Sequence, residues 1–206
     1  DKIYEHSLIE GSGRWIEEYL SPDELFERKF GQIQFKEEKV ITHPFYFEGN
    51  KKPRFYQQIA VQKAIEAIAN GKNRILLTLA TGTGKTYASA FALRENNPRK
   101  ALFLVHREQI AKQAIESYKK IFGNTKTFGL LSGNSKDFET DYLFSTMQMM
   151  SKEENFTRFK EDEFDIIVID EAHRIGANSY QKIIQYFKPK LLLGMTASPE
   201  RTDGYD

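Results

Sequence analysis

The stretch RILLTLATGTGKT, residues 74–86, decides the fold of this chain. Residues 74–79 are a short apolar run typical of a strand, and the residues from Lys85 onward are typical of a helix. Gly82 and Gly84 lie between the two, and both allow backbone angles that bulkier residues resist. A strand, a Gly-rich turn and a helix in this order predict a loop whose N–H groups surround phosphate oxygens at the start of the helix.

Each residue of this loop has an expected role toward a nucleoside triphosphate. The N–H groups of Thr81 and Thr83, with those of the two glycines, are expected to face the phosphates. Lys85 is placed to reach the β- and γ-phosphates, and Thr86 to put its hydroxyl on Mg²⁺. The strict pattern has one more glycine where this chain has Leu79. A chance Gly- and Thr-rich turn is the alternative, and a second motif counts against it.

The second motif follows the apolar run FDIIVI, residues 164–169, which is typical of a strand buried on both faces of a parallel sheet. Asp170 and Glu171 come directly after it, at the end of the strand where ligands bind in such sheets. Asp170 is expected to hold Mg²⁺, and Glu171 to polarise the water that attacks the nucleotide. His173 is predicted to have a mechanical role, the alternative being an ordinary structural polar side chain.

Six segments resemble, in order, the motifs of superfamily 2 helicases and translocases. They are PRFYQ (53–57), ATGTGKT (80–86), FLVHR (103–107), FSTMQ (144–148), DEAH (170–173) and MTASPERTDG (195–204). The resemblance implies a RecA-like α/β lobe with a doubly wound, mostly parallel sheet. It also implies ATP and Mg²⁺ as cofactors and double-stranded DNA as a partner.

More narrowly, the chain is similar to the restriction subunit of type I restriction-modification enzymes, with a ResIII-type ATPase domain. SPDEL (21–25), PRFYQ (53–57) and ILLTLATGTGK (75–85) carry this resemblance, and the PTRELA form of DEAD-box RNA helicases is missing. In that family a nuclease domain precedes this region, a second motor lobe follows it, and modification and specificity subunits are partners. The resemblance implies an N-terminal extension over residues 1–50 and the first motor lobe over 51–206, with the second lobe absent.

The resemblance also implies roles for residues outside the two central motifs. Arg54 and Gln57 are expected to hold and read adenine, the alternative being a polar pair at the start of a helix. Side chains after other strands are expected to contact nucleic acid or to couple it to hydrolysis: His106, Arg107, Ser145, Thr146, Gln148, Thr196 and Ser198. Capping on the surface is the alternative for His106 and Arg107.

Composition limits the class of protein. A chain of 206 residues with 40% hydrophobic residues can build one large domain, or one domain plus an appendage, with a sizeable core. The net charge is only +1, so any DNA contact is expected to be a local patch. The chain has no cysteine, which excludes disulfides and Cys-based metal sites. With no apolar run near the ~20 residues of a membrane span and no signal peptide, a cytoplasmic protein is expected.

The hydrophobic pattern predicts strands alternating with helices. Two short strands are expected within residues 2–8 and 14–19, and a helix over 56–69 with the apolar stripe Ile59, Val61, Ala64, Ile65 and Ile68. Further strands are expected at 75–79, 101–105, 127–131, 142–145, 166–170 and 191–195, and helices at 85–96, 107–120 and 178–187. Such alternation favours a mostly parallel sheet with helices on both faces.

A nuclease-like spacing near the N-terminus has a simpler interpretation. Pro22-Asp23 and Glu37-Glu38-Lys39 fit the pattern of many Mg²⁺-dependent nucleases. Asp23, however, falls in the first turn of a helix expected to start at Ser21, where an acid favours the helix dipole. Residues 36–39 are an unbroken charged run, unlike a strand that buries one face. Capping is therefore the favoured interpretation, and a nuclease is expected upstream of residue 1.

The sequence thus predicts an ATP hydrolase, the ATP-binding lobe of a double-stranded DNA translocase within a restriction endonuclease. A stand-alone superfamily 2 DNA helicase in repair is the alternative of the same class. A nucleotide-dependent DNA-binding scaffold without turnover is the alternative of another class, and the intact Lys85 and Glu171 argue against it.

Overall fold

The computed structural model describes residues 3–6, 13–16, 21, 53–174 and 178–197. The chain divides into two compact units, residues 1–36 and 37–206. In the first unit, β1 (Ile3–His6) and β2 (Gly13–Ile16) pair antiparallel, which confirms the two short strands. The helix expected from Ser21 and the nuclease-like residues lie outside the described residues, as does the expected boundary near residue 50.

The second unit is built on a six-stranded sheet in which all neighbouring strands are parallel. Its strands are β3 (Arg74–Thr78), β4 (Ala101–Val105), β5 (Phe128–Leu131), β6 (Tyr142–Thr146), β7 (Ile166–Asp170) and β8 (Leu191–Thr196). Their order in space is β3-β8-β7-β4-β6-β5. The predicted α/β fold with a doubly wound parallel sheet is confirmed, and all six carboxyl ends lie at one edge.

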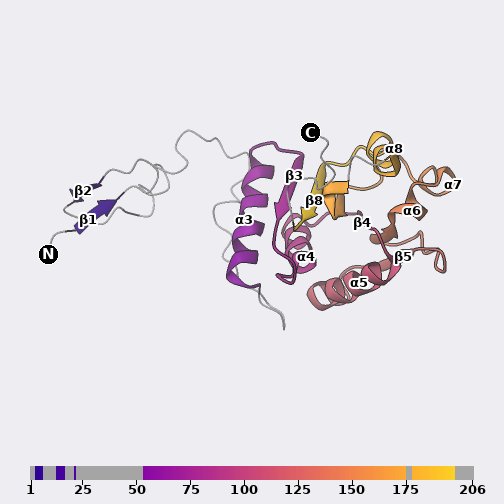
Figure 1. Ribbon diagram of the computed structural model, residues 1–206, viewed down its shortest axis with the longest axis horizontal. Helices are drawn as coiled ribbons and strands as arrows, with labels where there is room; N and C mark the ends of the chain where they lie inside the picture. Colours follow the sequence, from indigo (N-terminus) through magenta and orange to yellow (C-terminus); the bar gives the residue numbers. More distant parts are fainter. Residues whose placement is uncertain (1–2, 7–12, 17–20, 22–52, 175–177, 198–206) are drawn as a thin grey trace. The chain divides into compact units, whose positions relative to one another are not determined.

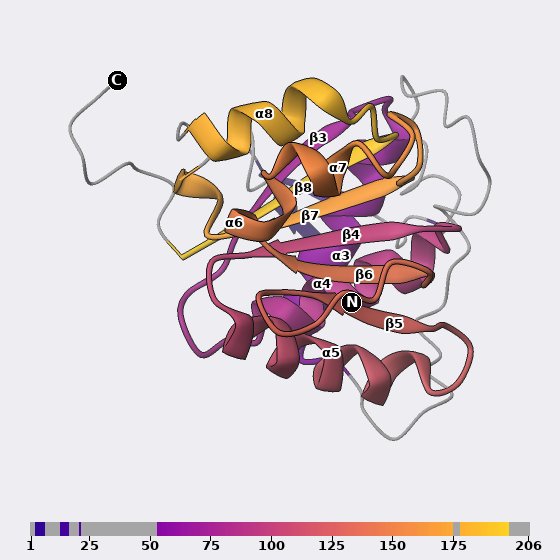
Figure 2. The same cartoon turned by 90° about the vertical axis from the view of Figure 1, so that its right-hand side faces the viewer.

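Helices cover both faces of this sheet (Figure 1 and Figure 2). One face carries α3 (Phe55–Ala69), α4 (Lys85–Asn96) and α5 (Glu108–Phe122), and the other carries α6 (Met147–Met150), α7 (Glu153–Phe156) and α8 (Asn178–Tyr186). A 3₁₀ turn, η1 (Ala172–Arg174), follows β7. The short α6, α7 and η1 were not predicted. Within the part of the chain that the structure describes, no helix has both the length and the apolarity of a membrane span.

Strand β4 shows how the two faces of the sheet form two cores. Ala101, Phe103 and Val105 pack with α3, α4 and α5, whereas Leu102 and Leu104 pack with α6 and α8. All five side chains are buried. A strand covered on both faces needs apolar side chains along its length, which is why β4 and residues 166–169 of β7 are continuous apolar runs in the sequence.

The predicted apolar stripe of α3 is wrong at one position. Val61 and Ala64 are buried and Ile65 and Ile68 pack against the same core, but Ile59 is 44% exposed. With 3.6 residues per turn, two residues of a helix separate side chains by about 200°. Ile59 therefore points away from the sheet that Val61 faces.

Candidate nucleotide and nucleic-acid site

The two central motifs meet at the carboxyl edge of the sheet because β8 pairs with both β3 and β7. Thr78 at the end of β3 is the partner of Thr196, and Asp170 at the end of β7 is the partner of Met195. The loop after β3 and the acidic motif after β7 therefore leave the sheet on either side of one strand. Ligands of open parallel sheets bind at this edge.

The loop between β3 and α4 has the backbone shape that the sequence predicts. Gly82 and Gly84 have φ angles of +76° and +81°, in the left-handed region that favours glycine. The Thr83 hydroxyl donates to the carbonyl oxygen of Ala80 at 2.6 Å, which closes the turn. Thr81 and Gly82 are exposed, so a ligand can reach this part of the loop.

Lys85 and Thr86 are the first two residues of α4, and Gly84 is the N-cap of this helix. The N–H groups of the first helical turn have no carbonyl partner within the helix, and the helix dipole makes this end positive. Both side chains are half-buried. The start of α4 therefore has the donors and the charge that a phosphate group requires.

Gln57 connects α3 to this loop. Its Nε2 donates to the carbonyl oxygens of Thr83 at 3.0 Å and Gly84 at 3.2 Å, and its Oε1 accepts from the Arg54 N–H at 2.9 Å. The side chain is 5% exposed. The exposed Arg54 guanidinium donates to the Tyr56 hydroxyl at 2.9 Å. The Gln57 amide thus fixes the loop in this structure, and adenine recognition by Gln57 and Arg54 stays a prediction.

The Asp170 carboxyl is affected by burial and by the charges of its neighbours. Burial raises the pKa of the Asp170 carboxyl, and the negative charge of Glu171 raises it further. The positive charge of Lys85 partly opposes this shift in the Asp170 pKa. The structure therefore brings the acidic motif close to the phosphate loop, as the sequence predicts. The neighbouring carboxylates of Asp170 and Glu171 concentrate negative charge that a bound cation would stabilise.

Glu171 and His173 link the acidic motif to the end of β8. Glu171 has a φ of +54°, a left-handed conformation that costs a non-glycine residue about 1–3 kcal/mol and is concentrated at functional sites. Its Oε2 lies 3.3 Å from His173 Nδ1, and this nitrogen lies 3.1 Å from the Thr196 hydroxyl oxygen. The structure thus places Thr196 beside the DEAH motif, within reach of the role predicted for it.

Gly194 is a site residue that the sequence analysis missed. It lies in β8, and a Cβ on it would approach the Cβ of Ala172 to 2.9 Å. Only a glycine at this position lets the turn after Glu171 pack directly on β8. An isolated glycine within an apolar strand is the signal that could have predicted this close approach.

The predicted residues after β4 lie at the same edge of the sheet. His106 and Arg107 directly follow β4, and both are exposed. Arg107 is also the N-cap residue of α5, without a side-chain capping hydrogen bond. Both side chains are therefore accessible to a nucleic acid. Ser198, after β8, lies outside the described residues.

The three predicted residues near the end of β6 differ in exposure. The Ser145 hydroxyl is buried, 3.2 Å from the Leu131 carbonyl oxygen and 3.1 Å from that of Thr146. Thr146 is 8% exposed, and its hydroxyl accepts from the Met149 N–H at 3.4 Å as the N-cap of α6. Gln148 is exposed. Contact with a DNA phosphate stays a prediction for all three, and Gln148 has the exposure that such a contact requires.

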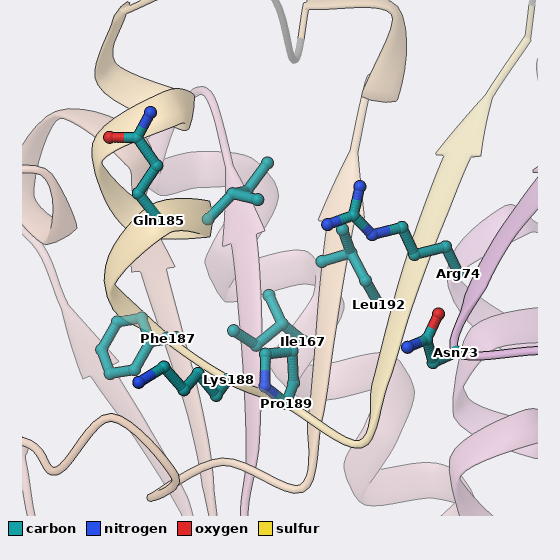
Figure 3. A pocket seen from close by; sticks show the side chains of 9 residues that line it. Asn73, Arg74, Ile167, Gln185, Phe187, Lys188, Pro189 and Leu192 are labelled. Carbon is teal, nitrogen blue, oxygen red and sulfur yellow. The ribbon is translucent and has the colours of Figure 1, made fainter.

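A hollow of about 300 Å³ lies at the opposite edge of the sheet (Figure 3). Asn73 and Arg74 line it at the start of β3, Leu192 at the start of β8, and Phe187 to Pro189 after α8. These are the amino ends of the strands whose carboxyl ends carry the phosphate loop and Thr196. The hollow is therefore separate from the predicted nucleotide site.

Residues 50–201 match the sequence profile of the family described as type III restriction enzyme, res subunit. The chain belongs to this family. Res-subunit domains of this kind are superfamily 2 helicase-like, so the predicted superfamily is confirmed. ATP dependence is a property of the helicases and ATPases in this group.

A curated relative agrees with the narrower resemblance. The chain is 36% identical over 205 residues to the type I restriction enzyme EcoAI endonuclease subunit of Escherichia coli. The match covers 91% of this chain and 25% of that subunit. The chain thus spans about a quarter of the length of this relative.

Two solved structures share the fold of the second unit. One is a nuclease-deletion mutant of the type ISP restriction-modification enzyme LlaGI in complex with a DNA substrate mimic, with a TM-score of 0.56 and 26% identity over 73% of this chain and 18% of that one. The other is the Hef helicase domain of Pyrococcus furiosus, with a TM-score of 0.60 and 26% identity over 73% of this chain and 34% of that one. The second unit of this res-subunit domain is therefore a RecA-like helicase lobe.

Proposed function

We propose that this chain is the ATP-binding lobe of a double-stranded DNA translocase in a restriction subunit. The observation that carries the proposal is the meeting of the phosphate loop with Asp170 and Glu171 on either side of β8. A phosphate anchor beside two carboxylates is the arrangement that nucleotide hydrolysis uses, since catalysis rests on positioning and on neutralising charge.

The residues at this edge suit ATP with Mg²⁺. Mg²⁺ binds oxygen ligands and usually takes one or two carboxylates together with substrate phosphates and water. Asp170 supplies a carboxylate whose pKa is raised by burial and by Glu171, so a cation beside it would be stabilising. Thr86 and Asp170 would hold this ion, which neutralises phosphate charge.

The remaining side chains have distinct roles in the proposed reaction. Lys85 stabilises the charge of the β- and γ-phosphates from the start of α4. Glu171 orients the attacking water and accepts its proton. His173 holds the Glu171 carboxylate and connects it to Thr196.

The relatives support a DNA partner and a longer protein. Two of the similar solved structures are complexes with DNA, a substrate mimic in one case and double-stranded DNA in the other. Since the chain spans about a quarter of its E. coli relative, we place the first motor lobe at residues 51–206, an extension before it, and a second lobe elsewhere in the full-length protein. A nuclease domain and modification and specificity subunits complete the proposed restriction enzyme.

A stand-alone DNA helicase in repair is the second candidate, and likeness to the Hef helicase domain favours a helicase activity. The two candidates differ in what ATP hydrolysis does to DNA. A restriction translocase moves along a duplex without separating its strands, whereas a helicase unwinds them. A nucleotide-dependent scaffold would bind ATP without hydrolysing it.

The test uses the full-length protein with ATP, Mg²⁺ and linear double-stranded DNA. The expected result is DNA-stimulated ATP hydrolysis with displacement of a triplex-forming oligonucleotide and without separation of the duplex strands. Strand separation would favour the repair helicase, and ATP binding with no hydrolysis would favour the scaffold. Either result contradicts the proposed function.

A further inference from the structure

Three polar groups form a buried chain that ends at the first turn of α4. The Ser89 hydroxyl oxygen lies 2.8 Å from the Thr86 carbonyl oxygen and 2.9 Å from the Tyr118 hydroxyl oxygen. Ser89 is fully buried and Tyr118 is 1% exposed. Because Ser89 belongs to α4 and Tyr118 to α5, this chain joins the helix of the phosphate loop to its neighbour.

The direction of the chain follows from its hydrogens. A serine hydroxyl has a single hydrogen, and a carbonyl oxygen can only accept. Ser89 therefore donates to Thr86 and accepts from Tyr118, which leaves none of the three groups unsatisfied. Burial strongly raises the pKa of the Tyr118 hydroxyl, so this group keeps the hydrogen that it donates.

The ring of Tyr118 is held on several sides by aromatic neighbours. Its centroid lies 5.0 Å from that of Phe144 and 5.6 Å from that of Phe103, both edge-on, and 5.9 Å from that of Phe122. Phe103 and Phe144 belong to β4 and β6, so the position of the ring is set by the sheet. Close packing of this kind leaves the hydroxyl little freedom to move.

A second donor on the Thr86 carbonyl restricts the first turn of α4. A helical carbonyl accepts one N–H from the following turn and has a second lone pair free. Ser89 occupies this lone pair. With both lone pairs occupied, the peptide group after Thr86 is held in place, and with it the Cα–Cβ bond from which the Thr86 hydroxyl projects.

We propose that Tyr118, acting through Ser89, is a positioning residue that orients Thr86 toward Mg²⁺. This inference rests on the proposed function, because it deepens the assignment of Thr86 as a ligand of the ion. Without the Tyr118 hydroxyl, the Ser89 oxygen loses the donor that holds it in place, and its own hydrogen bond to the Thr86 carbonyl weakens. The first turn of α4 is then held less firmly, the Thr86 hydroxyl is less well placed for the ion, and the nucleotide site requires more Mg²⁺.

The aromatic cluster offers a matched pair of variants. Tyr118→Phe removes the hydroxyl and keeps the ring. Tyr142→Phe is the control, because Tyr142 lies in the same cluster with its ring centroid 6.4 Å from that of Tyr118. Its buried hydroxyl has no hydrogen-bond partner among the residues that the structure describes.

The measurement is ATP binding by the full-length protein, determined by calorimetry at a series of Mg²⁺ concentrations. Tyr118→Phe is expected to raise the half-saturating Mg²⁺ concentration about threefold to tenfold, the effect of one net hydrogen bond, and high Mg²⁺ restores binding. Tyr142→Phe leaves this concentration unchanged. A Tyr118→Phe variant that melts at a lower temperature but keeps the unmutated Mg²⁺ requirement overturns the proposal.

Ser89→Ala provides a second variant of the same chain. It is expected to shift the Mg²⁺ requirement as Tyr118→Phe does, and the double variant to shift it no further than either single variant. Additive shifts would mean that the two hydroxyls act independently, which overturns the proposal. If the unmutated protein binds no ATP at any Mg²⁺ concentration, the proposed function itself fails. If it binds ATP and Tyr118→Phe behaves identically, only the positioning role fails.

Discussion

The Nδ1 atom of His173 and the hydroxyl oxygen of Thr196 lie 3.1 Å apart and join the acidic motif to the end of β8. The same nitrogen lies 3.3 Å from a carboxylate oxygen of Glu171. A ring nitrogen carries at most one hydrogen, so His173 Nδ1 cannot donate fully to both oxygens at once. A movement at the end of β8 therefore changes the hydrogen bonding of Glu171.

Thr196→Val tests this link, because valine keeps the shape of the side chain and removes its hydroxyl. The DNA-stimulated rate of ATP hydrolysis is expected to fall up to about tenfold, the effect of one hydrogen bond, and more than the unstimulated rate does. Thr196→Ser is the control, since it keeps the hydroxyl. Equal losses in the two variants would contradict a role for the hydroxyl in coupling.

Gln57→Glu tests the connection between α3 and the phosphate loop. The substitution places a carboxylate oxygen against the carbonyl oxygens of Thr83 and Gly84, where Nε2 donates at present. Losing two hydrogen bonds is expected to cost about 1–3 kcal/mol, which is roughly a fivefold to hundredfold weakening of ATP binding measured by calorimetry. Gln62→Glu, on an exposed position of α3, is the control.

Base selectivity separates two roles of Gln57. If the residue only fixes the loop, Gln57→Glu and Gln57→Ala weaken ATP and GTP binding equally. If it also reads adenine, as the sequence predicts, the unmutated protein prefers ATP and Gln57→Ala removes much of this preference. Unweakened ATP binding in Gln57→Glu would contradict the structural connection.

Asp170→Asn is expected to stabilise the nucleotide-free protein at neutral pH. Burial and Glu171 raise the pKa of Asp170 in the folded state, so the folded protein binds this proton more tightly than the unfolded chain does. Stability therefore falls as pH rises from the ordinary aspartate pKa of about 4 through the raised pKa. Asparagine does not ionise, so the Asp170→Asn variant does not lose this stability. In thermal unfolding without Mg²⁺, Asp170→Asn should melt at a higher temperature than the unmutated protein at neutral pH. The difference between the two melting temperatures should shrink as the pH falls. A lower melting temperature of Asp170→Asn at neutral pH would contradict the destabilising effect of the buried Asp170 charge.

Asp165 stabilises the opposite edge of the sheet. One oxygen of its carboxylate accepts from the Arg99 backbone N–H at 2.8 Å, and the other lies 3.0 Å from Lys190 Nζ. Asp165→Ala leaves the Arg99 N–H without this acceptor and is expected to lower the free energy of unfolding by about 1–3 kcal/mol, measured with urea. Asp165→Asn, which keeps an acceptor, loses less. The exposed Asp162→Ala is the control, and an equal effect of the two alanine variants would contradict the role of Asp165.

The sheet and its phosphate loop could be predicted because their causes are local in the sequence. Strand β4 and residues 166–169 of β7 are apolar at every position because both faces are covered, and Gly82 and Gly84 mark the turn that needs positive φ angles. The hydrogen bonds of Gln57 and Tyr118 could not be predicted. The bonds from Gln57 Nε2 to the phosphate loop and from Tyr118 to Ser89 join residues 26 or more positions apart, and they depend on how α3, α4 and α5 pack together, which no local pattern records.

The sequence also could not predict which polar side chains at the strand ends are exposed to solvent. Ser145 and Thr146 follow the pattern of strand-end polar residues, yet both are buried, and the Thr146 hydroxyl caps α6. Gln148, which is three positions after Ser145 and two after Thr146, is exposed. Which of these side chains faces solvent depends on the short turn after β6, whose length is below what hydrophobic periodicity can resolve.

The measurement that most directly tests hydrolysis at this edge is single-turnover ATP hydrolysis by the full-length protein and its Glu171→Gln variant. Glutamine keeps the shape of the side chain but cannot accept a proton from water, so ATP and DNA binding should persist while the rate falls by a factor on the order of 10²–10⁴. Asp170→Asn, measured in parallel, removes a charged oxygen ligand of Mg²⁺. ATP binding by this variant should therefore depend less on the Mg²⁺ concentration. Hydrolysis by Glu171→Gln at the unmutated rate would contradict the catalytic assignment and leave the acidic motif with a structural role alone.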